Sequence, residues 1–363
     1  MPPNYWDYLK LDSLLTLQDG LETEAELVPD ELHFIVVHQV YELWFKLTLA
    51  ELRLARDHLS APSVPEERVP YVVHHLKRVN RILDLALEQW GVMETLTPQD
   101  FLGFRDKLIP ASGFQSFQMR EIELLMGLSD EQRVTYGKVH PLDHIRKLAA
   151  GSPAGEMAWG RIKAVMEEQT LRSALHEWLY RTPIDGSGPD DAGDDAAVGR
   201  FIDAYLAAQE EHQRAQWLQF KKVPETDPDQ VETNLKTAAA AARKFLTAAD
   251  VPEDSRSKMR RIRAGLLFIE SYRTLPLLAW PRTLVDTIVE LEQKMVIFRT
   301  RHARMVERMI GRRVGTGGSS GVDYLDRTTR YRVFTELWAV RTLLLPKSAL
   351  PPLQNSSTYG FAR

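Results

Sequence analysis

Apolar residues recur at helical spacing through most of this chain, whereas short alternating runs bounded by turns are scarce. The clearest pattern covers about 284–310, with intervals of four and three residues between its members. These members are Leu284, Ile288, Leu291, Met295, Phe298, His302, Met305 and Met309. The spacing places them on one face of a helix that packs against other helices, and His302 is the only polar residue on that face.

Further helices are expected in the first third of the chain. The segment 29–59 opens with Pro-Asp and contains no later glycine or proline, so it predicts one long helix. A second helix fits 69–91, where a glycine closes the apolar pattern. Thr97 precedes a proline and, three residues on, an acid, which predicts a helix that starts there and ends before Pro110. Another helix fits roughly 113–127, and together these elements predict an all-α fold.

The middle of the chain changes composition. Residues 184–199 concentrate glycine, proline and aspartate without aromatic side chains, which is typical of a mobile acidic surface loop. Helical patterns resume over about 200–221 and, after a turn-rich stretch, through the alanine-rich segment 234–246. We interpret about 184–260 as a peripheral helical insertion in a single domain that spans residues 1–363.

Composition narrows the classes of function. The chain has 363 residues, of which 44% are apolar and 26% charged, the balance of a soluble globular protein. Its formal charge of −4 provides no basic field that would attract a phosphate backbone, so we expect no nucleic-acid partner. No apolar run approaches the ~20 residues of a membrane span, and the first residues lack a signal-peptide pattern. We therefore expect a cytoplasmic protein without membrane association.

Cysteine is absent from the chain. Its absence excludes disulfides, thiolate nucleophiles, iron–sulfur clusters, cysteine-type zinc sites and thiolate-ligated haem. A metal ion bound here would therefore be held by histidine, carboxylate, tyrosine or methionine side chains.

Three polar residues interrupt apolar helix faces and are candidates for a site. A buried imidazole without partners costs about 1–3 kcal/mol, so His302 is either a hydrogen-bonded core residue or a ligand of a metal or haem. His38 has a similar setting on another long helix, where it is either a hydrogen-bonded core residue or, with His302, one side of a pocket. Arg105 shares a helix face with Phe101 and Leu108. Its guanidinium either extends to solvent or pairs with a buried anion, for which its planar shape suits a carboxylate.

The loop GTGGSSG, residues 315–321, follows the long helix that carries His302. It does not match a phosphate-binding motif, because it follows a helix instead of a strand and lacks the lysine of a P-loop. It offers backbone N–H groups and the hydroxyls of Thr316, Ser319 and Ser320, and Thr316 lies 14 residues after His302. We expect a flexible polar loop at this position.

Four stretches of the chain together resemble one enzyme family. They are YWDYLKLDSLL (5–15), DELHFIVVHQVYELWFKLTLAEL (30–52), TPQDFLGFRDKLIPASGFQSFQMREIE (97–123) and RHARMVERMIGRRVGTGGSSGVDYL (301–325). In this order they resemble the tryptophan 2,3-dioxygenase family, over both ends of the chain and most of its first 130 residues. The stretch from about 150 to 280 is similar mainly in its helical character.

The resemblance implies a bound haem b. In that family the histidine 14 residues before the threonine of GTGG is the proximal haem ligand, and this position is His302 here. The histidine of FIVVHQ, here His38, lies on the distal side and is expected to position the indole N–H of the substrate. Ser112 and Gly113 match pocket-lining positions beside the cofactor.

The same resemblance implies a tryptophan site. Arg105, in the motif DFLGFR, corresponds to the residue that binds the substrate carboxylate, and Thr316 to the one that contacts the substrate ammonium. Phe34, Phe101 and Leu108 match positions that line the indole pocket. An amino-acid zwitterion enters an apolar slot only if both of its charges are paired, and Arg105 with the Thr316 loop would supply both partners.

Tyr5 and Tyr8 match aromatic residues that a neighbouring subunit lends to the site, which implies a homotetramer. The implied reaction uses O₂ as co-substrate and cleaves the indole C2–C3 bond of L-tryptophan. Its product is N-formylkynurenine, and the reaction belongs to tryptophan catabolism by the kynurenine pathway.

Two alternatives stay open. Family members commonly have an arginine where this chain has Asp326, with a longer lead into the following RYRVF segment, and Lys107 and Ile109 replace commoner tyrosine and serine. These differences leave room for a tailoring oxygenase that acts on a modified tryptophan or indole in secondary metabolism and inserts only one oxygen atom. A non-catalytic haem binder or sensor is the third hypothesis, although it has no need of Arg105 and Thr316 together.

Overall fold

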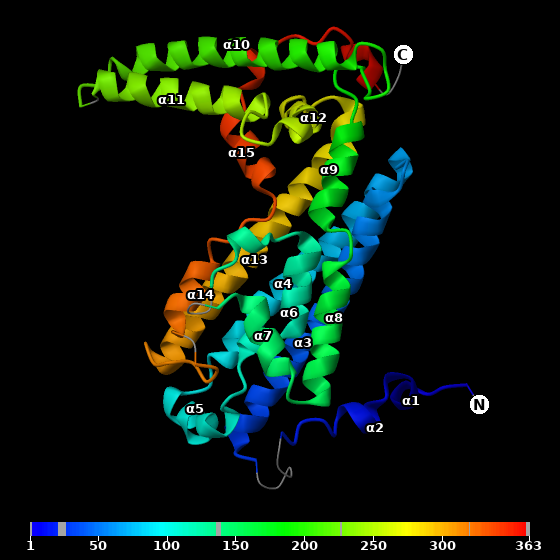
Figure 1. Cartoon of the computed structure of the whole chain (residues 1–363), viewed down its shortest axis with the longest axis vertical. Helices are drawn as coiled ribbons and strands as arrows, with labels where there is room; N and C mark the ends of the chain where they lie inside the picture. Colours follow the sequence, from blue (N-terminus) through cyan, green and yellow to red (C-terminus); the bar gives the residue numbers. More distant parts are fainter. Residues whose placement is uncertain (1, 21–26, 136–138, 226, 319, 361–363) are drawn as a thin grey trace. The chain divides into compact units, whose positions relative to one another are not determined.

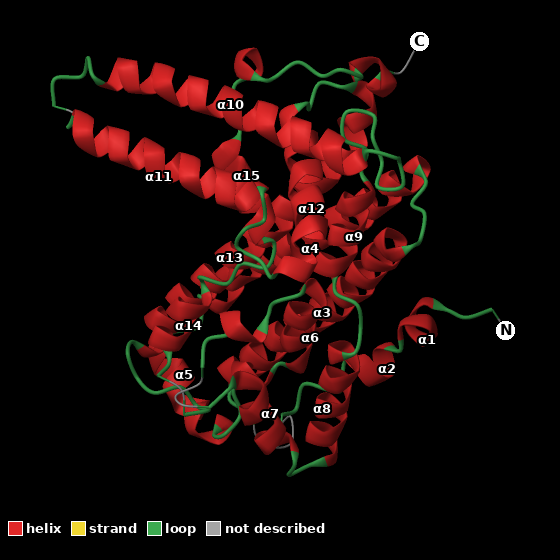
Figure 2. Ribbon diagram, turned by 45° about the horizontal axis from the view of Figure 1, so that its top comes forward, coloured by secondary structure: helices red, strands yellow, loops and turns green. Residues whose placement is uncertain are grey.

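The computed structural model describes residues 2–20, 27–135, 139–225, 227–318 and 320–360. Helices make up nearly all of the regular structure in these ranges (Figure 2), and the only β pairing there is an isolated bridge between Ile184 and Ser187. The expected all-α fold is therefore confirmed. Ser319, one of the loop hydroxyls noted above, lies outside the described residues. Within them, no helix combines the length and the apolar character needed to cross a membrane.

The chain forms two compact units. The first unit comprises Met1–Arg53, Leu76–Thr170 and Glu290–Val333, and the second comprises Leu54–His75, Leu171–Val289 and Phe334–Arg363. Each unit therefore draws on three separate stretches of sequence. The segment of about 184–260, expected to be a peripheral insertion, falls within the second unit, and its place in a single domain over 1–363 stays a prediction.

Within the described residues, the first unit contains residues from ten α-helices. The colours of Figure 1 show that most of these helices come from the first half of the chain. They are α1 (Tyr5–Leu9), α2 (Leu11–Leu14), α3 (Pro29–Ser60), α4 (Val69–Met93), α5 (Pro98–Phe104), α6 (Phe117–Met126), α7 (Pro141–Ala149), α8 (Pro153–Met166), α13 (Ala279–Ile310) and α14 (Val322–Thr328). The long helices expected over 29–59, 69–91 and 284–310 are confirmed as α3, α4 and α13. Helix α4 continues two residues past the expected glycine stop.

Local sequence sets both ends of α5. The Thr97 side chain accepts a hydrogen bond from the Asp100 N–H at 3.2 Å, and a proline occupies the first turn, as expected. After Phe104 the chain tightens into a 3₁₀ turn, Arg105–Leu108, before Pro110. Arg105 therefore stands at the C-cap of α5, where the helix ends.

The helix expected over 113–127 is divided in the structure. A 3₁₀ turn, Gly113–Gln115, precedes α6, and each piece has its own serine cap. The Ser112 side chain accepts from the Phe114 N–H, and the Ser116 side chain accepts from the Met119 N–H, each at 3.3 Å. Serine side chains compete with helical backbone bonding in this way, which interrupts the helix. Ser112 and Gly113 consequently lie on the turn before α6.

The apolar face expected on α13 is buried. Its seven apolar members, which are 0–6% exposed, are Leu284, Ile288, Leu291, Met295, Phe298, Met305 and Met309. In the first unit, Phe298 packs with Tyr41 and Phe45 of α3 and Trp90 of α4, with ring centroids 5.3–6.2 Å apart. We call these four residues the aromatic layer, which joins three helices next to His302.

Helices of the second unit come mainly from the second half of the chain. They are α9 (Leu171–Arg181), α10 (Asp194–Phe220), α11 (Pro228–Leu246), α12 (Glu253–Ser271) and α15 (Thr335–Leu343). Helices α10 and α11 lie side by side in both views (Figures 1 and 2), and α12 packs against α9 and α15. The helices expected over about 200–221 and 234–246 are therefore present.

The acidic segment 184–199 is only partly a loop, because α10 already begins at Asp194. Gly193 caps this helix with a left-handed backbone (φ 89°), and two aspartates occupy its first turn, where the helix dipole favours negative charge. The side chain of Asp194 also accepts a hydrogen bond from the Ser187 hydroxyl at 2.9 Å. The aspartates of this segment indicated a loop from composition alone, but two of them, Asp194 and Asp195, lie in the first turn of a helix.

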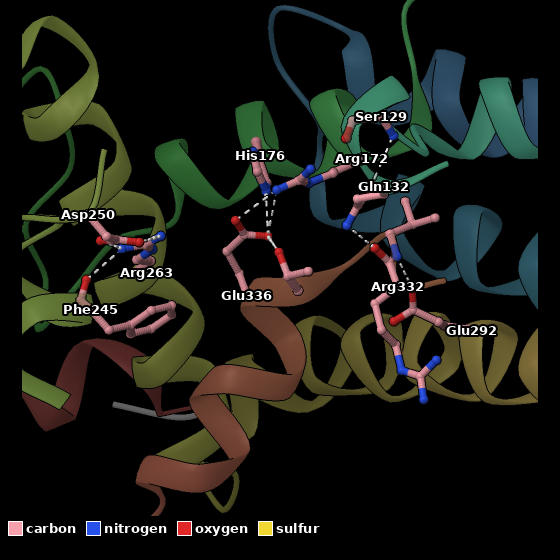
Figure 3. Close-up of polar contacts among 12 residues, drawn as sticks. Ser129, Gln132, Arg172, His176, Phe245, Asp250, Arg263, Glu292, Arg332 and Glu336 are labelled. Carbon is pink, nitrogen blue, oxygen red and sulfur yellow. Dashed lines mark hydrogen bonds and ion pairs between the residues drawn. The ribbon is translucent and has the colours of Figure 1, made fainter. Parts of the chain in front are cut away.

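A buried ion-pair group connects two helices of the second unit. Glu336 on α15 is 6% exposed, and its two carboxylate oxygens accept from Arg172 on α9 at 2.9 and 3.2 Å (Figure 3). The His176 Nε2 lies 3.5 Å from the same carboxylate. Burial opposes ionisation, but His176 and Arg172 outweigh it and lower the pKa of Glu336 to about 2. We call these three residues the Glu336 group.

Candidate functional site

A cavity of about 260 Å³ lies within the first unit. Its walls come from α3, α4, α5, α6, α13 and α14, and most of the lining side chains are aromatic or aliphatic. The expected site residues that line it are Phe34, His38, Phe101, Arg105, Ser112, Gly113, His302 and Thr316. Residues from both ends of the first unit's sequence therefore meet in one apolar chamber, which is the usual character of a small-molecule site.

His302 lines this cavity from α13. Its ring stacks on the Trp90 indole, with centroids 4.9 Å apart and planes inclined by 7°. No other residue in the described part of the chain forms a hydrogen bond with its ring nitrogens. Burial lowers the pKa of His302 to about 4, and the charges of His38, Arg299 and Arg120 act in the same direction. The imidazole is thus neutral at physiological pH and keeps a lone pair that can bind a metal.

His38 lines the cavity from α3. Its Nδ1 lies 2.7 Å from the Phe34 carbonyl oxygen, and the two rings are in contact at 4.0 Å between centroids. Burial lowers the pKa of His38, so the ring is neutral. Because a carbonyl oxygen only accepts hydrogen bonds, Nδ1 must carry the proton, and Nε2 keeps its lone pair. His38 can therefore accept an N–H group from a molecule in the cavity.

Arg105 connects the end of α5 to the glycine-rich loop. Its Nη2 donates a hydrogen bond to the Val314 carbonyl at 2.5 Å, and its buried Nε has no partner among the described residues. Thr316, two residues after Val314, lines the same cavity. A cation and a hydroxyl therefore lie close together, as the pairing of an amino-acid carboxylate and ammonium would require.

The loop after α13 folds back on itself before α14 begins. The Gly318 N–H donates to the Gly315 carbonyl at 2.8 Å. Gly321 has a φ of 59°, and a Cβ atom there would lie 2.7 Å from the Arg313 carbonyl oxygen. Only glycine fits such a close approach. Figure 1 shows this turn next to α5, which agrees with the bond from Arg105 to the loop.

Three of the expected site residues do not line the cavity. Leu108 is half-buried in the 3₁₀ turn after α5. Tyr5 and Tyr8 are 69% and 77% exposed on α1, a helix that buries none of its residues. The role of all three in a tryptophan site stays a prediction, and that of the two tyrosines depends on a second copy of the chain.

Sequence reasoning missed a charged group at the cavity wall. The Glu123 carboxylate on α6 is 2% exposed and meets three guanidinium groups, those of Arg299 at 2.8 Å, Arg133 at 2.8 Å and Arg120 at 3.3 Å. Although burial opposes ionisation, these cations lower the pKa of Glu123 to about 2. We call these four residues the Glu123 cluster; Arg120 and Arg299 line the cavity.

The sequence contains only weak signals for the Glu123 cluster. Arg120 and Glu123 stand three residues apart in QMREIE, a spacing that is also typical of an exposed helix pair. Arg133 and Arg299 join them only through the packing of α13 and of the turn after α6. Trp90 was also missed, although an aromatic residue near the end of an apolar helix is a weak signal for contact with a neighbouring helix.

The geometry can now be compared with known proteins. The family model described as tryptophan 2,3-dioxygenase matches residues 2–344. The chain belongs to the tryptophan 2,3-dioxygenase family. The match includes the middle stretch from about 150 to 280, which contains none of the four motifs and resembles the family mainly in its helical character. The resemblance expected from those motifs is thus confirmed, and the chain is an enzyme of an oxidoreductase family.

Individual relatives support the same assignment. A tryptophan 2,3-dioxygenase of Sorangium cellulosum is 48% identical over 366 residues, which cover 99% of this chain and 87% of that relative. Tryptophan 2,3-dioxygenase 2 of Ralstonia nicotianae is 46% identical over 371 residues, or 99% and 98% of the two chains. The tryptophan 2,3-dioxygenase of Anopheles gambiae is 34% identical over 355 residues, or 97% and 88%. The similarity therefore spans nearly the whole chain, well beyond the glycine-rich loop motif.

Proposed function

We propose that this chain catalyses the haem-dependent cleavage of the indole C2–C3 bond of L-tryptophan by O₂, which yields N-formylkynurenine. The observation that supports this most strongly is the cavity of the first unit, where His302, His38, Arg105 and Thr316 share one largely apolar chamber. Membership of the tryptophan 2,3-dioxygenase family points to the same reaction.

The residues around the cavity fit a haem b. A haem b would need a neutral side chain to hold its iron and an apolar enclosure around its ring. His302 offers a neutral imidazole whose ring nitrogens have no hydrogen-bond partner in the described chain, and the aromatic layer with Met93 and Met305 provides apolar walls. Ser112 and Gly113 would lie beside the cofactor. When bound, haem supplies the oxygen chemistry of the reaction.

The polar residues would bind and orient the substrate. Arg105 would pair with the tryptophan carboxylate in a charge-assisted contact, and the Thr316 hydroxyl would accept from the ammonium. Phe34 and Phe101, whose ring centroids are 5.9 Å apart, would pack against the indole ring. Closure of the loop after α13 over a bound substrate would exclude water, which strengthens both polar contacts.

His38 would fix the position of the indole. Its Nδ1 proton is engaged by the Phe34 carbonyl, so the free lone pair of Nε2 is the acceptor available to the indole N–H. A positioning role requires only this hydrogen bond. Replacing His38 by alanine is expected to weaken binding of L-tryptophan more than binding of 1-methyltryptophan, which has no indole N–H to donate.

The comparisons favour this reaction over the two alternatives. The named relatives that span nearly the whole chain are tryptophan 2,3-dioxygenases, which gives no support to a tailoring oxygenase or a non-catalytic haem binder. Asp326, which motivated the tailoring hypothesis, pairs with Arg304 on the outside of α13 and does not line the cavity. The cytoplasmic location, the homotetramer and the place in the kynurenine pathway stay predictions from the resemblance.

The proposal is tested by reconstituting the purified protein with haemin, reducing it and adding L-tryptophan under O₂. We expect one haem per chain, an absorption spectrum that shifts when tryptophan binds, and formation of N-formylkynurenine. An absorption spectrum that does not change when tryptophan is added would identify a haem binder without this activity. Preferred turnover of a substituted indole, or a product with only one added oxygen atom, would instead favour a tailoring oxygenase.

A matched pair of variants tests the substrate site separately from the cofactor. Arg105→Leu removes the proposed carboxylate partner and is expected to weaken tryptophan binding about 100-fold, since a buried charge left unpaired costs on the order of 3 kcal/mol. Lys107→Leu removes a cation from the same 3₁₀ turn that does not line the cavity, and it should leave tryptophan binding unchanged. Loss of haem from the Arg105 variant would contradict the role assigned to this residue.

A further inference from the structure

Three guanidinium groups share the single carboxylate of Glu123. Arg299 donates to Oε1 and Arg133 to Oε2, each at 2.8 Å. Arg120 reaches the same Oε1 only at 3.3 Å, and its buried Nε has no partner among the described residues. A guanidinium has five N–H donors, and leaving them unpaired inside a protein is costly. Of the three arginines, Arg120 therefore makes the longest contact with Glu123, and its guanidinium also interacts with the Tyr324 hydroxyl and lies 5.7 Å from the centroid of the Phe114 ring.

Arg120 is also buried and borders the cavity. It is 7% exposed, and it lines the same chamber as His302 and Arg105. The other cavity-lining cation of the cluster, Arg299, is already engaged, because it bonds Glu123 and stacks at 4.7 Å on the Tyr331 ring. A buried cation with an unpaired donor at the wall of an apolar cavity has the chemistry to bind an anion.

The position of Arg120 separates it from the substrate end of the cavity. It shares a carboxylate oxygen with Arg299, which precedes His302 by less than one helical turn on α13. Arg105 instead bonds to Val314, beyond the C-terminal end of that helix. Helix α13 rises roughly 17 Å between Arg299 and its last residue, so the two arginines serve different parts of the chamber.

We propose that Arg120 binds a propionate carboxylate of the haem, and that the other members of the Glu123 cluster hold its guanidinium ready for this contact. This inference rests on the proposed function, because it needs a haem in the cavity. The substrate has a single carboxylate, for which Arg105 and Thr316 already form a site at the loop end. A porphyrin held by His302 would carry two carboxylates of its own, and Arg120 lines the same cavity as His302.

Esterified haem provides a direct test. Apo-protein is titrated with haemin and with haemin dimethyl ester, whose propionates carry no charge, and the ratio of the two dissociation constants is measured. In the wild type the ester is expected to bind at least about tenfold more weakly, since a hydrogen bond to a charged group is lost. In Arg120→Met this ratio should fall by about tenfold, and in Arg120→Lys it should be intermediate because a cation is retained.

Arg133→Met is the matched control. Arg133 bonds the same Glu123 carboxylate but does not line the cavity, so its removal disturbs the cluster without removing the proposed propionate contact. The ratio for this variant should equal that of the wild type. An Arg120→Met protein that keeps the wild-type ratio overturns the inference, and so does an equal loss of the ratio in both variants.

Two further outcomes separate this inference from its alternatives. If Arg120→Met keeps the ratio but weakens binding of tryptophan more than that of tryptamine, Arg120 contacts the substrate carboxylate and the inference is wrong. If the wild type binds haemin and its ester with equal affinity, the inference about Arg120 is wrong. This test needs no variant, so it holds even if the variants do not fold. A wild type that takes up no haemin refutes the proposed function itself.

Discussion

Each unit contains a buried carboxylate whose pKa is lowered to about 2, but the two are surrounded differently. In the second unit, both oxygens of Glu336 bond to one arginine, Arg172, and His176 lies beside them. In the first unit, three arginines converge on the two oxygens of Glu123. The Glu336 group contains one guanidinium for one carboxylate, whereas the Glu123 cluster contains a surplus of positive charge.

This difference distinguishes a structural ion pair from one that serves a site. Glu336 connects α15 to α9, and neither Arg172 nor His176 of its group lines the cavity. The surplus cation of the Glu123 cluster, Arg120, lies instead at the wall of the cavity that contains His302. Buried groups that violate local pairing rules are commonly found at functional sites, where a ligand completes the pairing.

The largest expected effect is on stability when either carboxylate loses its charge. Glu123→Gln leaves three buried guanidinium groups around a neutral amide and is expected to lower the free energy of unfolding by about 3–5 kcal/mol. Glu336→Gln should cost less, about 2 kcal/mol, because only one arginine loses its partner. Urea unfolding of both apo-proteins measures the difference. A larger loss for Glu336→Gln would contradict the view that the Glu123 cluster is the more strongly charged of the two.

For the arginines we expect the opposite order: replacing Arg172 should destabilise the protein more than replacing Arg120. Arg172→Met removes the two hydrogen bonds that Glu336 accepts from this arginine and is expected to destabilise the apo-protein by about 2–4 kcal/mol. Arg120→Met removes a cation whose only contact with Glu123 is long, while Arg299 and Arg133 keep their shorter bonds. Its effect on apo-protein stability should be within about 1 kcal/mol. Equal destabilisation by the two changes would show that Arg120 is a structural residue.

Lowering the pH should reduce the free energy of unfolding through protonation of both carboxylates. Their pKa values are near 4.5 when unfolded and about 2 when folded, so the unfolded state binds more protons in this range. The stabilisation is therefore complete above pH 4.5 and is lost as the pH falls toward about 2, by up to about 3 kcal/mol for each group. Unfolding free energies measured at about pH 5 and pH 3 test this. Glu123→Gln and Glu336→Gln should each show a smaller loss than the wild type.

The smallest effect is expected for an exposed ion pair near the cavity loop. Asp326 pairs with Arg304, and each side chain is 48% exposed. Solvent screens such pairs, so Asp326→Ala should change the free energy of unfolding by less than about 1 kcal/mol and the affinity for tryptophan by less than about twofold. A marked change in substrate preference would restore Asp326 as a determinant of specificity and support the tailoring alternative.

The reliability of sequence interpretation varied along the chain with the kind of signal. The period of the apolar residues on α13 and the proline and acid after Thr97 act within one helix, and both predictions agree with the structure. The segment 113–127 failed as one helix because Ser112 and Ser116 each cap a separate piece. The segment 184–199 failed as one loop because aspartates favour both loops and helix N-termini, and composition does not separate the two.

For the site, the sequence by itself determined which residue types are available and where they recur: two histidines and an arginine on apolar helix faces, and a loop of glycines with a threonine. Tertiary structure alone decided that these residues share one cavity, that a tryptophan ring stacks on His302, and that Arg120 makes only a long contact with Glu123. The physical reason is that helix periodicity and capping depend on neighbours within about four residues. Charge balance around Glu123 depends instead on side chains from α6, α13 and the turn after α6, which only packing brings together.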